Sequence, residues 1–267
     1  MQHEILAIVI LALLLIIPLA CAERRRRRTS YSPFQFLLWI TAKLLVRVLW
    51  RAQLPRRLPP EADAGAVVVC NHRSSIDPFF FQVCCTRPMH WMVAKEYCEH
   101  RAFRWFLTAC EVIPVNRGGI DTAATKAAIR FAQEGDVVGM FPEGRINMTD
   151  QFMLPIRPGA VLVALRAGRP LLPCYIEGSP YRGTAWSPFF MTARVKVHFG
   201  ELIDISPYLD RKNDDTLMRE LMTRVVKEIA RLAGHDDFEP AFAGRRWKPT
   251  EEELQADMQA IAERRQA

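Results

Sequence analysis

Asn71-His72-Arg73-Ser74-Ser75-Ile76-Asp77-Pro78-Phe79 directly follows Ala66–Cys70, a short apolar run that is rich in valine. An apolar run of this length predicts a buried strand. The Asp77-Pro78 pair predicts that a helix begins there, with Asp77 as the N-cap and Pro78 at the first helical position. A strand that leads through a short loop into a helix is typical of α/β folds. The stretch therefore predicts an α/β domain with polar side chains at the carboxyl end of a buried strand.

The alternation of strands and helices continues along the chain. Further strands are predicted at Trp91–Ala94, Val112–Val115, Val137–Phe141, Leu171–Ile176 and Val195–Phe199. Helices are predicted at Asp121–Glu134, Gly159–Ala167 and Asn213–Ala233, the first two closed by Gly135 and Gly168. This order predicts a mixed, largely parallel sheet that is flanked by helices.

An uncharged apolar segment, Ile5–Ala22, precedes this domain. At ~1.5 Å rise per residue, a helix of this length reaches about 27 Å, which just crosses the hydrocarbon layer of a bilayer. Ala20-Cys21-Ala22 also resembles a signal-peptide cleavage site, but the residues before the segment contain no Lys or Arg. The arginines Arg24–Arg28 favour an uncleaved anchor with its C-terminal side in the cytoplasm. We therefore expect a single-pass transmembrane helix in the inner (cytoplasmic) membrane and a cytoplasmic catalytic domain.

A second apolar segment follows the arginines. It covers Pro33–Leu54 and carries basic residues at every fourth position: Lys43, Arg47 and Arg51. On a helix this spacing makes one basic stripe beside an apolar face, which is typical of an amphipathic helix at the membrane interface. Trp39 and Trp50 are then available for the interface. Because an amphipathic helix packed on the domain gives the same pattern, both interpretations stay open.

Length and composition limit the organisation of the chain. Its 267 residues suffice for one large α/β domain with small appendages. We divide it into a membrane anchor with a basic flank at 1–28, an amphipathic helix and linker at 29–60, the α/β domain at 61–235 and a polar tail at 236–267. In the tail, Thr250 and Glu253 form a capping-box pattern that predicts a last helix to about residue 265.

Charge and cysteine usage indicate the kind of partner. The formal net charge of +7 favours an anionic partner. Because the densest basic run lies beside an apolar segment, a lipid surface is favoured over nucleic acid. The seven cysteines include no Cys-x-x-Cys pair and no Cys/His cluster at zinc spacing. They therefore predict reduced, mostly buried thiols and no metal site.

His72 and Asp77 are the residues that could carry chemistry. The loop between them can fold the carboxylate onto one imidazole nitrogen, which fixes the tautomer and leaves the other nitrogen as a general base. The plainer interpretation is that Asp77 only caps a helix and His72 is an ordinary loop residue. Spacing alone leaves both open. Ser74 and Ser75 lack a Gly-x-Ser-x-Gly elbow, so a serine hydrolase is not indicated.

The pattern His72-x4-Asp77 resembles the first signature block of the glycerolipid acyltransferase family, which includes the 1-acylglycerol-3-phosphate acyltransferases. Three later stretches resemble the family's other blocks in the same order: Val112-Ile113-Pro114-Val115-Asn116-Arg117, Phe141-Pro142-Glu143-Gly144-Arg145 and Leu172-Pro173-Cys174-Tyr175-Ile176. Val93-Ala94-Lys95-Glu96 resembles a lysine-bearing segment found between the first two blocks. Each block alone is a weak signal, but together they cover about half the chain in the family's order and strongly favour a catalytic His72 and Asp77.

The resemblance implies an enzyme that moves an acyl chain from acyl-CoA or acyl-carrier protein to the hydroxyl of a lysophospholipid. His72 would remove the hydroxyl proton and Asp77 would stabilise the imidazolium. No cofactor is implied besides the thioester co-substrate. The residues implied in substrate binding are Asn71, Lys95, Arg117, Glu143, Gly144, Arg145 and Pro173.

Among these residues, Arg117 would hold an acceptor phosphate, with Lys95 and Arg145 as helpers. Glu143 would orient Arg117 or a substrate hydroxyl, or it would form a structural ion pair. Gly144 would let the backbone approach the substrate closely.

One departure from the family pattern, the arginine directly after Gly144, leaves the acceptor open, and a second, at Pro114, should affect packing more than charge. Arg145 follows Gly144 directly, which resembles the acyltransferase halves of bacterial lysophospholipid-remodelling proteins, and Pro114 replaces the usual aromatic residue. We expect lysophosphatidic acid as the acceptor, with lysophosphatidylethanolamine or another lipid alcohol as the alternative. A non-catalytic module that binds anionic membrane lipids is the interpretation outside enzymes, but such a module needs neither His72 nor Asp77.

Overall fold

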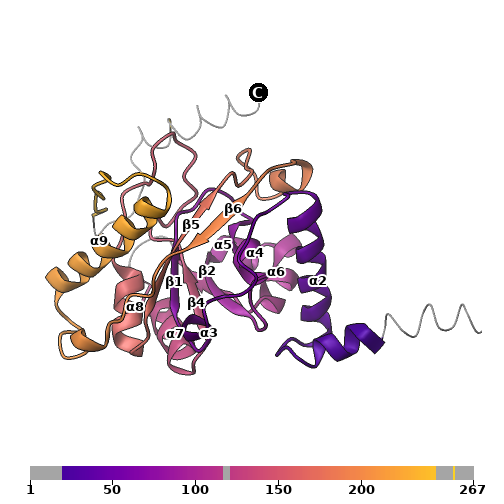
Figure 1. Cartoon of the computed structure of the whole chain (residues 1–267), viewed down its shortest axis with the longest axis horizontal. Coiled ribbons are helices and arrows are strands. Elements are labelled where there is room, and N and C mark those ends of the chain that lie inside the picture. The colour runs from indigo at the N-terminus through magenta and orange to yellow at the C-terminus, as the bar shows by residue number, and fades with distance from the viewer. Residues whose placement is uncertain (1–19, 117–120, 245–254, 256–267) are drawn as a thin grey trace, which may run out of the picture.

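A computed structural model describes residues 20–116, 121–244 and 255. Its centre is a six-stranded sheet in the order β3-β2-β4-β1-β5-β6 (Figure 1). The strands are β1 (Val67–Cys70), β2 (Met89–Ala94), β3 (Ile113–Val115), β4 (Val137–Met140), β5 (Leu171–Glu177) and β6 (Lys196–Phe199). All neighbouring strands are parallel except β6, which pairs antiparallel with β5. The predicted mixed, largely parallel sheet is confirmed.

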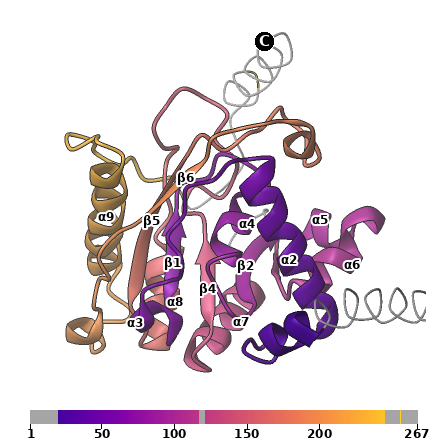
Figure 2. The same ribbon diagram turned by 45° about the vertical axis from the view of Figure 1, so that its right-hand side comes forward.

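Helices cover both faces of the sheet (Figures 1 and 2). One face packs against α2 (Pro33–Val48) and α4 (Asp77–Gln82), and the other packs against α7 (Thr122–Gln133), α8 (Gly159–Ala167) and α9 (Asp215–Leu232). The connections contain α3 (Pro60–Asp63), α5 (Lys95–Glu99), α6 (Arg101–Ala109) and the 3-10 helices η1 (Ser187–Phe190) and η2 (Ser206–Tyr208). Each sheet face therefore has its own apolar core.

The central strand β1 contributes to both cores. Val67 and Val69 pack toward α8 and α9, whereas Val68 and Cys70 pack toward α4. All four residues are fully buried. A strand that is covered on both sides must be apolar at every position, which explains the continuous run seen in the sequence. The loops after β1, β4 and β5 then leave the sheet at the same edge, because these three strands are parallel neighbours.

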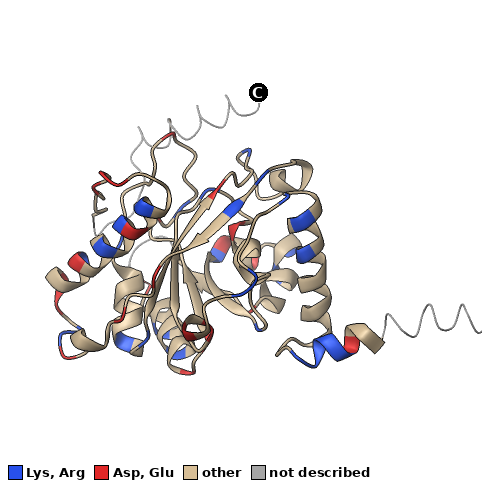
Figure 3. Cartoon of the chain, viewed as in Figure 1, with Lys and Arg blue, Asp and Glu red and all other residues tan. Residues whose placement is uncertain are grey.

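The α2 helix agrees in part with both interpretations of its sequence. Phe36 and Val46 are buried, as expected for a helix packed on the domain. Its outer face exposes a row of large apolar side chains: Phe34, Leu37, Ile40, Leu44 and Val48. In Figure 3 the helix is mostly tan, with blue only in its C-terminal half. The helix is therefore anchored on the domain and presents an apolar surface outward.

Trp39 and Trp50 do not lie on this outer surface, so their predicted place at a membrane interface is wrong. They are 5% and 0% exposed. The indole N–H of Trp39 donates to the Cys85 carbonyl at 3.1 Å, and that of Trp50 donates to the Pro188 carbonyl at 3.0 Å. A buried indole is stable where its N–H finds such an acceptor.

The helix is also shorter than the predicted Pro33–Leu54. It ends at Val48, and the chain then extends along the edge of β6, where the Gln53 amide donates to the Val195 carbonyl at 2.8 Å. Arg51 adopts φ 40° outside the helix, so it does not belong to the predicted basic stripe. Pairing with a strand edge ends the helix here.

The predicted anchor Ile5–Ala22 lies outside the described residues, apart from its last three. No helix within the described part of the chain combines the length and the apolar character needed to span a bilayer. The helix predicted from Thr250 also lies outside the described residues, apart from residue 255, which is helical.

Candidate active site

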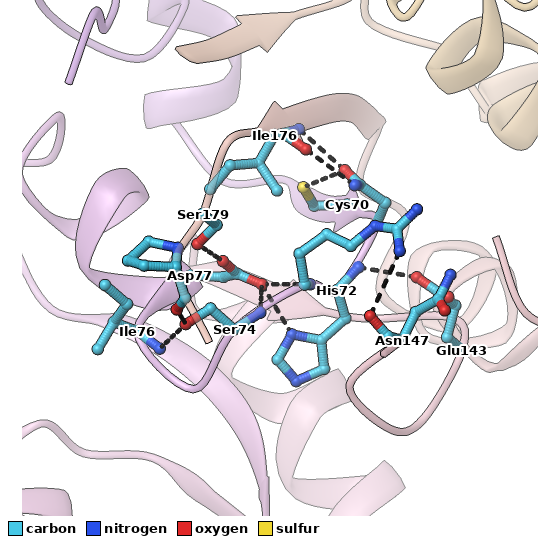
Figure 4. A network of polar contacts seen from close by, with 12 residues as sticks. Cys70, His72, Ser74, Ile76, Asp77, Glu143, Asn147, Ile176 and Ser179 are labelled. Atoms are coloured by element: carbon cyan, nitrogen blue, oxygen red, sulfur yellow. Dashed lines mark hydrogen bonds and ion pairs between the residues drawn. The ribbon is translucent and has the colours of Figure 1, made fainter. Parts of the chain in front are cut away.

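Asp77 is the centre of a hydrogen-bond network at the carboxyl end of β1 (Figure 4). Its carboxylate is fully buried. One oxygen, Oδ2, accepts from the amides of Arg73 and Ser74 at 2.7 and 2.8 Å and contacts Nδ1 of His72 at 2.9 Å. The other oxygen, Oδ1, accepts from the Ser179 hydroxyl at 2.5 Å. These donors compensate the loss of solvation of a buried charge.

Asp77 is therefore not the N-cap that the sequence suggested. Ile76 occupies that position, and Asp77 is the first residue of α4. Its side chain turns back to the loop before the helix, where three donors converge, instead of accepting from the amides of the first helical turn. The loop 72–76 folds around the carboxylate, which is how His72 and Asp77 are brought together.

The contact with Asp77 orients the imidazole of His72. An ionised carboxylate only accepts hydrogen bonds, so Nδ1 carries the proton and Nε2 is left as an acceptor. Nε2 points away from Asp77 (Figure 4). The side chain is 15% exposed, and its ring stacks on Phe141 with centroids 3.8 Å apart and planes 7° apart. The arrangement can accept a proton from a hydroxyl that is placed at Nε2.

The ring of Phe141 is itself held by a neighbouring strand. It stacks on Trp91 of β2 with centroids 4.6 Å apart. Trp91 is paired in register with Gly139 of β4, and a Cβ atom at Gly139 would collide with the indole. Gly139 thus makes room for Trp91, and the stacked rings restrict the imidazole of His72 to one orientation.

Glu143 holds the backbone of the catalytic loop. It is buried, and its Oε1 and Oε2 accept from the amides of His72 at 2.7 Å and Leu154 at 2.8 Å. Burial raises the pKa of its carboxyl to about 7, although both amide hydrogen bonds favour the charged form. The amide of Asn147 donates to the His72 carbonyl at 2.8 Å. Within the described residues Glu143 therefore acts on His72 through the main chain.

Two other predicted substrate-binding residues lie behind the site. Asn71 is buried, and its amide group exchanges two hydrogen bonds of 2.9 Å with the backbone of Ile176 in β5. Pro173 is buried inside β5, where it pairs in register with Val69. Both residues join β1 to β5 and so support the loop that carries His72.

A large cavity opens in front of the imidazole. It has a volume of about 1330 Å³ and is lined by His72, by the loop after β4 and by residues of α2, α4, α6 and α9. Leu38 and Leu45 of α2, Phe79 of α4 and Phe106 of α6 contribute apolar side chains. Cavities that bind apolar ligands combine such a lining with a few polar groups. The lining can accommodate an acyl chain beside His72.

Known proteins share this chain's sequence pattern and fold. Residues 50–177 match the protein-family model named Acyltransferase. A 1-acyl-sn-glycerol-3-phosphate acyltransferase of Bacillus subtilis (strain 168) is 28% identical over 63% of this chain and 82% of its own length. One of Borreliella burgdorferi is 24% identical over 72% of this chain and 75% of its own length. These matches support the glycerolipid acyltransferase family for this chain. It is therefore an acyltransferase.

A solved structure has the same fold as the acyltransferase. The 1-acyl-sn-glycerophosphate (LPA) acyltransferase PlsC of Thermotoga maritima superimposes with a TM-score of 0.56 at 19% sequence identity. The alignment covers 74% of this chain and 79% of that chain. It supports the α/β fold derived from the strand order.

The remaining predicted substrate-binding residues of the acyltransferase do not all line the cavity. Gly144 and Arg145 line the cavity beside His72. Lys95 is half-exposed and forms an ion pair with Glu99 at 3.5 Å, and it is not part of the cavity lining. Arg117 lies outside the described residues. Its role in binding a phosphate stays a prediction.

Ser179 was not predicted from the sequence, and we expect it to be a positioning residue of the acyltransferase. Replacing it with alanine removes the hydroxyl that donates to Asp77 Oδ1 and frees the carboxylate to rotate. We expect kcat to fall about 10-fold with KM nearly unchanged, because the loss concerns a hydrogen bond to a charged group. Ser179→Thr, which keeps the hydroxyl, should restore kcat. Steady-state kinetics, with Ser206→Ala as a control on an exposed serine, tests this. Equal losses in the alanine and threonine variants would contradict it.

Proposed function

We propose that this acyltransferase moves an acyl chain from acyl-CoA or acyl-carrier protein to the free hydroxyl of 1-acylglycerol-3-phosphate, which yields phosphatidic acid. The observation that carries the proposal is the contact of 2.9 Å between His72 Nδ1 and Asp77 Oδ2 on the wall of a largely apolar cavity. The names of the relatives from Bacillus subtilis and Borreliella burgdorferi support this acceptor.

The reaction proceeds by direct transfer. Nε2 of His72 takes the hydroxyl proton while the hydroxyl oxygen attacks the thioester carbonyl carbon. The tetrahedral intermediate then collapses, the carbon–sulfur bond breaks, and the leaving thiolate takes the proton back from Nε2. Asp77 stabilises the imidazolium between these steps. The lipid hydroxyl is the nucleophile, so no serine or cysteine of the protein forms a bond to the acyl group.

The acceptor phosphate requires a cation near the imidazole, because only a short glyceryl link joins it to the reacting hydroxyl. Arg145 meets this requirement, since it lines the cavity within two residues of Glu143, whose carboxylate contacts the His72 amide. Arg117, from the second block of the resemblance, would add a second guanidinium. Guanidinium groups match phosphate with paired hydrogen bonds.

A panel of acceptors tests the proposed function. The purified full-length protein receives one acyl-CoA together with lysophosphatidic acid, lysophosphatidylethanolamine or glycerol 3-phosphate. We expect the highest kcat/KM with lysophosphatidic acid. A higher kcat/KM with lysophosphatidylethanolamine would make that lipid the acceptor and would leave the proposed reaction type unchanged. Lipid binding without any transfer would overturn the proposal in favour of a binding module.

The outer face of α2 supports a second part of the proposal, which is that the enzyme works at a membrane surface. The exposed row from Phe34 to Val48 lies on the helix whose inner side lines the cavity, so a lipid acceptor can reach the cavity from the bilayer. The adjacent run Arg24–Arg28 would pair with anionic head groups.

A charge placed in the apolar row should weaken membrane binding. We expect Leu44→Asp to reduce co-sedimentation with anionic vesicles several-fold, because Leu44 is 61% exposed and a carboxylate does not enter the acyl region. Ala123→Asp, at an exposed position on α7 on the opposite face of the sheet, is the matched control. Transfer to a detergent-solubilised acceptor should be unchanged in both variants. Unaltered sedimentation of the α2 variant would contradict this orientation.

A further inference from the structure

The cavity in front of His72 extends to both sides of the sheet. On one side it reaches Leu45 of α2 and Phe79 of α4, and on the other it reaches Leu162 of α8 and Met218 of α9. We call the part lined by α2, α4 and α6 the apolar arm, and the part lined by residues 144–162 and α9 the basic arm. His72 lies between the two arms, so two substrates can meet at its imidazole from opposite directions.

Charge distinguishes the two arms. Among the described lining residues, all three arginines belong to the basic arm: Arg145, Arg157 and Arg219. Asp215, one helical turn before Arg219, also lines this arm, and Asp121, at the start of α7, lines the cavity outside both arms. Three arginines therefore stand against two carboxylates, and the net charge of the lining is positive. The apolar arm contributes no Lys, Arg, Asp or Glu from the described residues. The apolar arm therefore fits acyl chains, and the basic arm fits an anionic group.

The structure holds two of these arginines in place. The guanidinium of Arg219 lies over the ring of Phe242, 4.1 Å from its centroid. Nη1 of Arg157 donates to the Glu143 carbonyl at 3.3 Å, beside Gly144. A Cβ atom at Gly144, where φ is +71°, would come within 2.9 Å of that Nη1. Gly144 thus leaves room for Arg157 at the cavity wall, and a stacked or hydrogen-bonded guanidinium loses less freedom when it binds an anion.

The geometry of the two substrates decides which anion fits. The acceptor phosphate must stay close to the imidazole, and Arg145 meets that requirement. In acyl-CoA and in acyl-carrier protein, a long pantetheine arm separates the thioester from a phosphate. That phosphate must therefore lie well away from the reacting carbon. The basic arm leads from His72 to α9, which packs on the opposite face of the sheet from α2 (Figure 1). Arg219, on α9, is placed for the donor.

We propose that Arg219 binds a phosphate group of the thioester donor, with the pantetheine arm lying along the basic arm of the cavity. This inference rests on the proposed function, because it takes a phosphopantetheine thioester as the donor. It assigns the two arms: the donor phosphates enter from the side of α9, and the lipid acceptor enters from the side of α2.

The test compares variants of the full-length enzyme in detergent. Arg219→Ala removes the cation that α9 contributes to the basic arm. Arg224→Ala is the matched control, because it removes the same charge from α9 where the helix lines a separate groove with Glu220 and Lys227. We expect Arg219→Ala to raise KM for acyl-CoA about 10-fold and to leave KM for lysophosphatidic acid unchanged, since a charge-assisted phosphate contact is lost.

A phosphate-free donor separates binding of the phosphate from other effects. With an acyl N-acetylcysteamine thioester, the Arg219→Ala variant should match the unmodified enzyme. A rise in KM for both acyl-CoA and acyl-carrier protein would assign the shared pantetheine phosphate, and a rise for acyl-CoA alone would assign the nucleotide phosphates. The inference is overturned if KM rises for lysophosphatidic acid instead, if the phosphate-free donor is affected equally, if Arg224→Ala has the same effect, or if no KM changes.

Calorimetry with CoA alone tests the donor site without any acceptor. Arg219→Ala should weaken CoA binding about 10-fold whichever lysophospholipid the enzyme uses. If lysophosphatidic acid is not the preferred acceptor but Arg219→Ala still weakens CoA binding, only the assignment of the acceptor is wrong. If lysophosphatidic acid is the preferred acceptor but Arg219→Ala leaves CoA binding unchanged, the proposed donor site is wrong and the proposed function is unaffected.

Discussion

Replacing His72 with alanine is expected to lower kcat for acyl transfer about 10²–10⁴-fold, because the reaction then lacks its general base. The loss should appear in kcat more than in KM, since Nε2 acts on the hydroxyl proton as it leaves and contributes little to ground-state binding. Single-turnover transfer from a labelled acyl-CoA to lysophosphatidic acid measures the effect directly.

The fold should survive this substitution. Without the imidazole, Asp77 still accepts from the amides of Arg73 and Ser74 and from the Ser179 hydroxyl, so no buried charge is left unpaired. The midpoint of thermal unfolding should therefore shift little. His198→Ala, at an exposed position of β6, is the matched control and should retain full activity. A His72→Ala enzyme that transfers at the unmodified rate would end the proposed mechanism.

The sequence predicted most of the sheet because its strands are buried on both faces. The runs that predict β1, β4 and β5 agree with the structure within one residue at each end. Such strands need apolar residues at every position, which leaves a strong local signal. The partner helices α7 and α8 were also predicted, because Gly135 and Gly168 mark where they end.

Features that depend on contacts between distant segments were not predictable in this way. The side chain of Asp77 looked like a helix cap, but it turns toward three donors from its own loop and to Ser179, which lies far along the chain. Trp39 looked like an interface residue, but the Cys85 carbonyl accepts its N–H inside the domain. A local pattern predicts which type of side chain a segment presents. The hydrogen-bond partner of that side chain depends on the order of the strands, because this order decides which distant segments meet.

The apolar face of α6 was not predicted, although the sequence of this helix carries the signal for it. Phe103, Phe106, Leu107 and Cys110 follow the spacing of one helical face. All four line the cavity, so this helix forms much of the apolar arm. No helix was predicted for this segment. The pairing of His72 with Asp77 followed from the resemblance to a family, because spacing alone did not decide it.

Replacing Asp77 with asparagine is expected to lower kcat about 10²–10⁴-fold while the folded structure is largely kept. The amides of Arg73 and Ser74 both donate to Oδ2, so the amide oxygen of asparagine must take that position. Its NH₂ group then faces the Ser179 hydroxyl, which can accept as well as donate. The variant thus removes the negative charge that stabilises the imidazolium and preserves the surrounding hydrogen bonds.

Asp77→Ala separates this electrostatic role from the structural one. It leaves the amides of Arg73 and Ser74 without their acceptor in a buried loop, so the free energy of unfolding should fall by about 3 kcal/mol or more. Urea unfolding and kcat, measured on both variants, should therefore diverge: both lose activity, and only alanine loses much stability. If the asparagine variant kept the rate of the unmodified enzyme, the charge of Asp77 would be unnecessary and its carboxylate would only hold the loop. If it lost activity and stability together, the amide would not have adopted the orientation that the two backbone donors require.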